Sequence, residues 1–140
     1  MLGEAGTDQA GSEPQKTLIL LVDDDLVSRT LARSVLEKSS FRVAEAGNGL
    51  AALAQLEAGT EPALIVVDLE MPEMGGREVL ARVRQTVATA GLPVLVLTGS
   101  GTEDMEAQLM EEGADDYIRK PLEPARFVAR VRAALRRAGE

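Results

Sequence analysis

The apolar run from Ala63 to Val67 is the feature that most constrains the fold. It is rich in β-branched residues and ends directly at Asp68, ahead of Met71-Pro72 and the glycine pair Gly75-Gly76. A run of this kind, bounded by turn residues, is typical of a strand buried on both faces of a parallel sheet. We therefore expect Asp68 at the carboxyl end of a buried strand, which is the edge where open α/β sheets bind ligands.

Strand-like apolar runs alternate with helical periods along the rest of the chain. The expected strands are Thr17–Val22, Phe41–Ala44, Ala63–Val67, Pro93–Leu97 and Asp116–Arg119. The expected helices are Leu26–Lys38, Leu50–Ala58, Arg77–Thr86, Glu103–Glu112 and a last helix that starts at Pro124. These crossovers are long enough for parallel pairing through right-handed βαβ connections. We predict an α/β fold, a doubly wound five-stranded parallel sheet of order 2-1-3-4-5, flavodoxin-like, in a three-layer αβα arrangement.

Composition narrows the classes of function. The chain has 140 residues, with 23 Asp and Glu against 15 Lys and Arg, and its net charge of −8 argues against direct binding to nucleic acid. It has no Cys and no His, which excludes disulfides, thiol catalysis and Ser-His-Asp triads. Its apolar runs are too short to span a bilayer, so we expect no membrane contact and a cytoplasmic location. Residues 1–16 should form a flexible N-terminal tail, and 17–138 one folded domain.

Polar side chains follow the predicted strands at one edge of the sheet. They are Asp23 and Asp24 after the first strand, Asp68 after the third, Thr98 after the fourth and Lys120 after the fifth. The first and third strands are neighbours in the predicted order, so their acids share a crevice, which is unfavourable unless a cation joins them. Mg²⁺ favours one or two carboxylates, waters and a phosphate oxygen, and Mn²⁺ is an alternative ion.

This arrangement indicates that Asp68 is a nucleophile toward phosphorus. Carboxylates form aspartyl-phosphates, and phosphoryl transfer depends mainly on positioning and on neutralising the equatorial oxygens. Mg²⁺ held by Asp24 and Asp68 would supply that neutralisation, together with the Thr98 hydroxyl and the Lys120 ammonium. Each residue alone is a common surface or capping feature, so the hypothesis depends on their order along the strand ends.

Four motifs resemble the receiver domain of bacterial two-component response regulators, of the chemotaxis-regulator type. They are Leu20-Leu21-Val22-Asp23-Asp24-Asp25, Val67-Asp68-Leu69-Glu70-Met71-Pro72, Val96-Leu97-Thr98 and Tyr117-Ile118-Arg119-Lys120-Pro121. The resemblance covers roughly residues 17 to 137. It implies phosphorelay signal transduction, in which Asp68 accepts a phosphoryl group from a sensor histidine kinase or a histidine phosphotransfer protein and a downstream protein effector receives the signal. The lack of His agrees, because the donor must be another molecule.

The resemblance also implies a ligand set for the metal. Asp24 and Asp68 would ligate Mg²⁺ directly, Asp23 would assist through water, and the main-chain carbonyl of Glu70 would complete the protein's share. The domain would catalyse only its own phosphorylation and dephosphorylation, and would not be an enzyme with a separate substrate. A phosphorylation-dependent homodimer is a further expectation.

Thr98 and Tyr117 would form the switch pair of such a domain, moving together when phosphate draws the Thr98 hydroxyl inward. Two positions depart from the family pattern. The family often has Met-Asp-Gly where this chain has Met74-Gly75-Gly76, so the usual cap of the third helix is missing. Gly99 stands where the family usually has alanine, which keeps room for the phosphoryl group.

Other classes share parts of this pattern. A phosphatase of the haloacid dehalogenase type is the enzyme alternative, because Asp23-Asp24-Asp25-Leu26-Val27 fits its Asp-x-Asp-x-Val signature, but its further acids are missing after Lys120. A flavodoxin-like flavin carrier would need aromatic side chains to sandwich the ring, but aromatic residues make up only 2% of this chain. A receiver-like module that has lost phosphorylation is disfavoured, because Asp24, Asp68, Thr98 and Lys120 are all present. No effector segment follows Arg137, so we expect a free-standing receiver or a piece of a larger regulator or hybrid kinase.

Overall fold

A single sheet of parallel strands organises the part of the chain that the computed structural model describes, residues 16–99 and 101–139. The predicted tail lies outside the described residues, apart from Lys16. The strands are β1 Leu18–Val22, β2 Arg42–Ala46, β3 Leu64–Asp68, β4 Val94–Thr98 and β5 Asp116–Arg119. Their order is β2-β1-β3-β4-β5, which confirms the predicted doubly wound topology.

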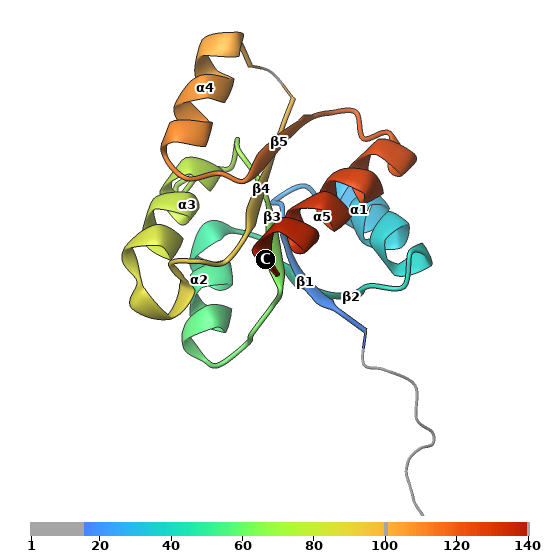
Figure 1. Cartoon of the computed structure of the whole chain (residues 1–140), viewed down its shortest axis with the longest axis horizontal. Helices are drawn as coiled ribbons and strands as arrows, with labels where there is room; N and C mark the ends of the chain where they lie inside the picture. Colours follow the sequence, from blue (N-terminus) through green and yellow to red (C-terminus); the bar gives the residue numbers. More distant parts are fainter. Residues whose placement is uncertain (1–15, 100, 140) are drawn as a thin grey trace, which may run out of the picture.

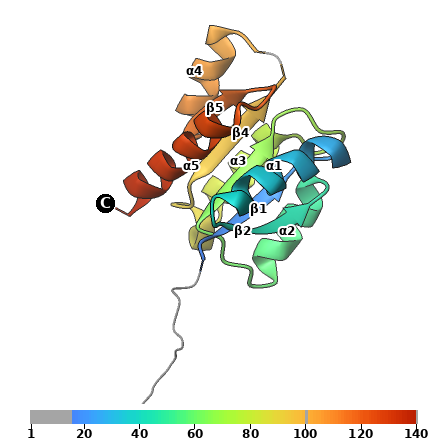
Figure 2. The ribbon, with the colours of Figure 1, turned by 90° about the vertical axis from the view of Figure 1, so that its right-hand side faces the viewer.

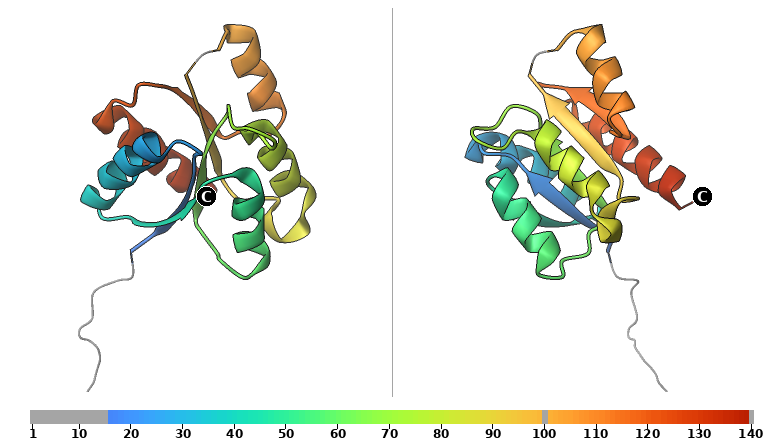
Figure 3. Two further views of the ribbon diagram at one scale, coloured as in Figure 1. Left: turned by 180° about the vertical axis from the view of Figure 1, so that it is seen from behind. Right: turned by 90° about the vertical axis from the view of Figure 1, so that its left-hand side faces the viewer.

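Helices cover both faces of the sheet. They are α1 Leu26–Lys38, α2 Gly49–Glu57, α3 Gly76–Gln85, α4 Glu103–Glu111 and α5 Pro124–Ala138, with a short 3-10 helix η1 Val87–Thr89. Figure 1 shows α2, α3 and α4 on one side and α1 and α5 on the other, and the views in Figures 2 and 3 agree. The three-layer αβα prediction is confirmed. η1 was not predicted, because one turn is too short to show a period. None of the described helices could cross a membrane.

The sheet is buried on both sides, as its apolar runs predict. All residues of β3 and β4 are buried. The side chains that pack with α2, α3 and α4 are Leu20, Val22, Ile65, Val67, Val94 and Val96. Those that pack with α1 and α5 are Ile19, Leu21, Leu64, Val66, Leu95 and Leu97. This alternation is that of a parallel sheet between two helical layers.

Strand β2 extends beyond the predicted end at Ala44. Glu45 and Ala46 continue the parallel pairing with β1. The polar Glu45 interrupted the apolar pattern, but its carboxylate accepts a hydrogen bond from Arg29 Nε on α1 (2.8 Å) and pairs with Arg33. The Arg29 guanidinium, followed by that of Arg33, holds the pKa of Glu45 below its usual value against the effect of burial. A charged residue on an edge strand also disfavours pairing with another sheet.

The helix termini follow the predicted signals. Asn48 caps α2 by accepting a hydrogen bond from Ala51 N (2.7 Å). Gly59 and Gly113 follow α2 and α4 with φ of +106° and +112°, the left-handed conformation that favours glycine. Gly75 precedes α3 without a side-chain hydrogen bond, in agreement with the missing family cap.

Gly76 permits α3 to begin directly against the end of β3. A Cβ atom at this position would lie 2.5 Å from the main-chain oxygen of Asp68 and 3.0 Å from Leu69 Cα. The Gly76 N–H donates to the Leu69 carbonyl at 3.0 Å. The backbone that carries Asp68 is therefore packed against the first turn of α3.

We expect Gly76→Ala to lower the free energy of unfolding by about 1–3 kcal/mol, because the added methyl group overlaps main-chain atoms that cannot move aside cheaply. Urea titration followed by circular dichroism measures this change. Gly91→Ala is the matched control, since its Cβ would meet nothing within 4 Å. Equal stability of the two variants would contradict the close approach.

Candidate functional site

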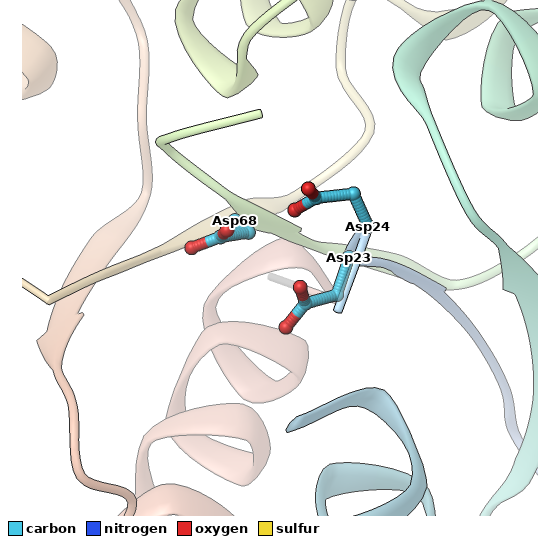
Figure 4. A group of neighbouring side chains, drawn as sticks. All are labelled: Asp23, Asp24 and Asp68. Atoms are coloured by element: carbon cyan, nitrogen blue, oxygen red, sulfur yellow. The ribbon is translucent and has the colours of Figure 1, made fainter. Parts of the chain in front are cut away.

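Three carboxyl groups gather where β1 and β3 end. Asp23 and Asp24 follow β1, Asp68 is the last residue of β3, and each offers an oxygen within 4.8 Å of the others. Figure 4 shows the three side chains grouped at this edge. Asp23 and Asp68 are 0% and 5% exposed, whereas Asp24 is open to solvent. The predicted crevice of acids is therefore present in the structure.

Lys120 lies at the same edge, directly after β5. Its Nζ atom is 3.1 Å from Asp68 Oδ1 and 3.3 Å from Asp23 Oδ2. Partial burial acts to lower the pKa of Lys120, but the carboxylates of Asp68 and Asp23 outweigh it and hold that pKa above its usual value. The side chain is therefore a cation at neutral pH. One ammonium facing three carboxylates leaves the site with an excess of negative charge.

The Asp68 carboxylate is incompletely satisfied. Its Oδ1 atom is buried and accepts no hydrogen bond from the described residues, although Lys120 lies at ion-pair distance. Burial raises the pKa of Asp68 to about 6, the Lys120 ammonium opposes the rise, and the charges of Asp23 and Glu70 add to it. A buried carboxylate oxygen that has an ion pair but no hydrogen bond, beside two further acids, fits a hard divalent cation. The residues present therefore suit Mg²⁺.

Thr98 ends β4 and is fully buried. Its hydroxyl donates to Glu70 Oε2 (2.9 Å), and the Gly99 N–H donates to Glu70 Oε1 (3.3 Å). The Glu70 carboxylate thus holds the end of β4 and the start of the next loop. Sequence reasoning placed the main-chain carbonyl of Glu70 at the metal site but did not predict these hydrogen bonds of its side chain, because no pattern in the sequence marks a contact between the loops that follow β3 and β4.

Tyr117 points into the protein from β5. It is 6% exposed, and its hydroxyl has no hydrogen-bond partner among the described residues. A Cβ atom on Gly101 would lie 2.5 Å from the Tyr117 hydroxyl and 3.8 Å from Thr98 Cγ2. Both predicted switch residues therefore adjoin the same position of the β4–α4 loop.

Comparison with known proteins gives the family. The model of the response regulator receiver domain matches residues 19–132. The chain belongs to the response regulator receiver domain family. The sequence-based resemblance is thereby confirmed, and the phosphatase alternative is not supported. Receiver domains of this family accept a phosphoryl group in two-component signalling.

The relatives of this receiver domain include transcriptional regulators. The transcriptional regulatory protein ResD of Bacillus subtilis is 43% identical over 129 residues, which are 91% of this chain and 52% of that protein. The phosphate regulon transcriptional regulatory protein PhoB of Pseudomonas aeruginosa is 39% identical over 121 residues, or 86% of this chain and 52% of that protein. The chain spans about half the length of these curated relatives.

Solved structures with the same fold include other receiver domains. A CheY-like response regulator receiver domain protein from Methanospirillum hungatei has a TM-score of 0.81 at 26% identity, covering 89% of this chain and 97% of that one. The chemotaxis protein CheY4 of Vibrio cholerae has a TM-score of 0.80 at 25% identity, covering 85% and 98%. The chemotaxis-regulator-like fold is thus confirmed.

The raised pKa of Asp68 predicts that Asp68→Asn stabilises the metal-free receiver at pH 7.5, by about 1–3 kcal/mol. Between about pH 4 and 6 the folded state holds a proton on Asp68 that the unfolded chain releases, so stability falls as the pH rises through this window. The variant should lose its advantage as the pH falls below 6 toward 4. Thermal unfolding in EDTA across this range measures it.

Asp24→Asn is the control for Asp68→Asn. It also removes one negative charge from the cluster, but from an exposed side chain, so we expect a smaller gain. A loss of stability in Asp68→Asn at pH 7.5, or an equal gain in both variants, would contradict the role of burial.

Proposed function

We propose that this receiver accepts a phosphoryl group on Asp68 from a histidine of a sensor histidine kinase or a histidine phosphotransfer protein, in a Mg²⁺-dependent reaction. The observation that carries this proposal is the buried Asp68 carboxylate. One oxygen of this carboxylate accepts no hydrogen bond from the described residues. The carboxylate lies between the Lys120 ammonium and two further acids. Family membership supplies the type of donor.

The chemistry we propose is a displacement at phosphorus. A carboxylate oxygen of Asp68 forms a P–O bond while the P–N bond to the donor histidine breaks and its nitrogen keeps the electron pair. Asp68 needs no base, because the pKa of about 6 leaves it ionised at neutral pH. Lys120, at 3.1 Å from Asp68 Oδ1, is placed to neutralise a phosphoryl oxygen, and the Thr98 hydroxyl to donate to another.

The metal ligands we propose are Asp24 and Asp68 directly, Asp23 through water, and the main-chain carbonyl of Glu70. Mg²⁺, or Mn²⁺ in its place, supplies positive charge to the transferring group when bound. The short distances within the acid cluster support the three carboxylates of this ligand set. With these groups the domain would catalyse its own phosphorylation and dephosphorylation and no other reaction.

The output we propose is a two-state equilibrium of the β4–α4 loop. A phosphoryl group on Asp68 competes with Glu70 for the Thr98 hydroxyl, and inward movement of Thr98 changes the space beside Gly101 that Tyr117 adjoins. A coupling of about 1–3 kcal/mol is typical for such switches. The changed surface would bind a downstream protein effector or a second copy of the chain in the cytoplasm.

The prediction of no direct contact with nucleic acid stays a prediction for this domain, based on its net charge of −8. The relatives are named as transcriptional regulatory proteins, and the matched region is about half of their length. They therefore do not confirm that the receiver domain itself makes no contact with nucleic acid. For a chain of this kind we propose that any DNA contact belongs to an effector under the control of the receiver.

Treatment with acetyl phosphate should add the mass of one phosphoryl group to the protein, and only when Mg²⁺ is present. Asp68→Asn should add none, and Lys120→Ala should lower the yield at least tenfold, since a removed electrostatic donor typically costs about 100-fold or more. Intact-mass spectrometry measures each. Modification of Asp68→Asn to the same extent, or full modification in EDTA, would contradict the proposal.

Glu70→Ala should bind beryllium fluoride, a phosphoryl mimic, about 3–10-fold more tightly than the unmodified chain, because the Thr98 hydroxyl no longer leaves a charged partner. Calorimetry gives the affinity. Fluorescence of Tyr117 reports the switch, since the chain has one Tyr and no Trp.

Glu73→Ala is the control for Glu70→Ala, because it removes an exposed acid of the same loop. Its affinity should match that of the unmodified chain. Equal or weaker binding by Glu70→Ala would contradict the competition, and constant fluorescence in every variant would contradict the switch role of Tyr117.

A further inference from the structure

Asp23 is held by donors from three parts of the chain. Its Oδ1 accepts from the Asp25 N–H (3.0 Å), and its Oδ2 accepts from Ser28 Oγ on α1 (2.7 Å) and from Lys120 Nζ (3.3 Å). The Asp23 side chain is 1% exposed, so these donors replace the water that a surface carboxylate would have. The Ser28 contact is the shortest of the three. Ser28 lies outside the four motifs and has no role assigned so far.

The first turn of α1 fixes Ser28 in turn. The Ser28 N–H donates to the Asp25 carboxylate at 3.0 Å, which caps the helix. The next residue, Arg29, donates from Nη1 to the Asp23 carbonyl (2.7 Å) and from Nε to Glu45 on β2 (2.8 Å). The start of α1 therefore holds both the main chain and the side chain of Asp23.

The Lys120 ammonium cannot pair equally well with Asp23 and with a phosphoryl group on Asp68. It now lies between Asp23 Oδ2 and Asp68 Oδ1, at 3.3 and 3.1 Å. A dianionic phosphoryl group on Asp68 attracts the ammonium more strongly than Asp23 does. Asp23 Oδ2 then keeps only the hydroxyl of Ser28 among these donors, and a buried carboxylate oxygen without a donor is costly.

We infer that Ser28 is a positioning residue, which keeps the Asp23 carboxylate oriented toward the metal site and lets Lys120 turn to the phosphoryl group. The inference rests on the proposed function and deepens it. Ser28 does not contact the phosphoryl group; it acts through Asp23. Groups that hold a metal-binding carboxylate in place typically contribute about 10–100-fold to metal affinity.

The test is calorimetric titration of the full chain with Mg²⁺ alone. Ser28→Ala should bind about tenfold more weakly, at the lower end because Ser28 is half-buried and water can partly replace its hydroxyl. Ser28→Thr retains a hydroxyl and should lie within about threefold of the unmodified chain. Ser34→Ala, at a half-buried serine of the same helix, should leave the Mg²⁺ affinity unchanged. Alanine favours helix, so α1 should form in each alanine variant.

A second readout separates positioning from general damage. The Mg²⁺ concentration for half-maximal modification by acetyl phosphate should rise in Ser28→Ala by the same factor of about ten, with little change in the rate at saturating Mg²⁺. A structural defect would instead lower the rate at saturation and the thermal midpoint in EDTA, and that result would overturn the inference.

The failures are distinguishable. Unchanged Mg²⁺ affinity in Ser28→Ala, or an equal loss in Ser34→Ala or Ser28→Thr, would overturn this inference and leave the proposed function intact. Absence of Mg²⁺ binding and of modification in the unmodified chain would overturn the proposed function, and this inference with it.

Discussion

Repulsion among carboxylates at one edge of the sheet is the constraint on which the site depends. The strand order brings the ends of β1 and β3 together, so Asp23, Asp24 and Asp68 lie within 4.8 Å of one another. Burial makes this repulsion stronger. Burial is also the main cause that raises the pKa of Asp68 to about 6. Lys120 offsets only part of the charge. A site of this kind has lower free energy once further positive charge arrives, so this edge of the sheet favours a cation.

The sequence was sufficient for the layers, the strand order and the position of the acids. Buried parallel strands need unbroken apolar runs, and a polar residue at the end of such a run, as Asp68 is, lies at the sheet edge wherever the strands are parallel. Contacts between side chains of different elements leave no recognisable pattern in the sequence. The bonds from Ser28 to Asp23 and from Thr98 to Glu70 depend on distances across the edge, and the structure was needed to find them.

Two carboxylates near Asp68 have different kinds of support. Asp23 is fully buried and held by donors from the α1 turn and from Lys120, so its orientation is restricted. Glu70 is exposed, and its carboxylate holds Thr98 and Gly99 in the arrangement seen here. A buried and restrained acid keeps its orientation, whereas an exposed one can leave when an anion competes for its donors. The edge thus combines one acid held by buried contacts with one held by exposed contacts.

Helix α4 can respond at lower cost than α5. It buries one residue, Leu109, whereas α5 buries Phe127, Val128, Val131 and Ala134. Its C-terminal end is tied to α3 by two hydrogen bonds from Arg77 to Glu112, at 2.8 and 2.7 Å, but both side chains are over 40% exposed and such pairs contribute little. Local opening free energy follows buried apolar contact. In the proposed switch, a change at Thr98 would therefore move α4 before it disturbs the sheet that holds the acids.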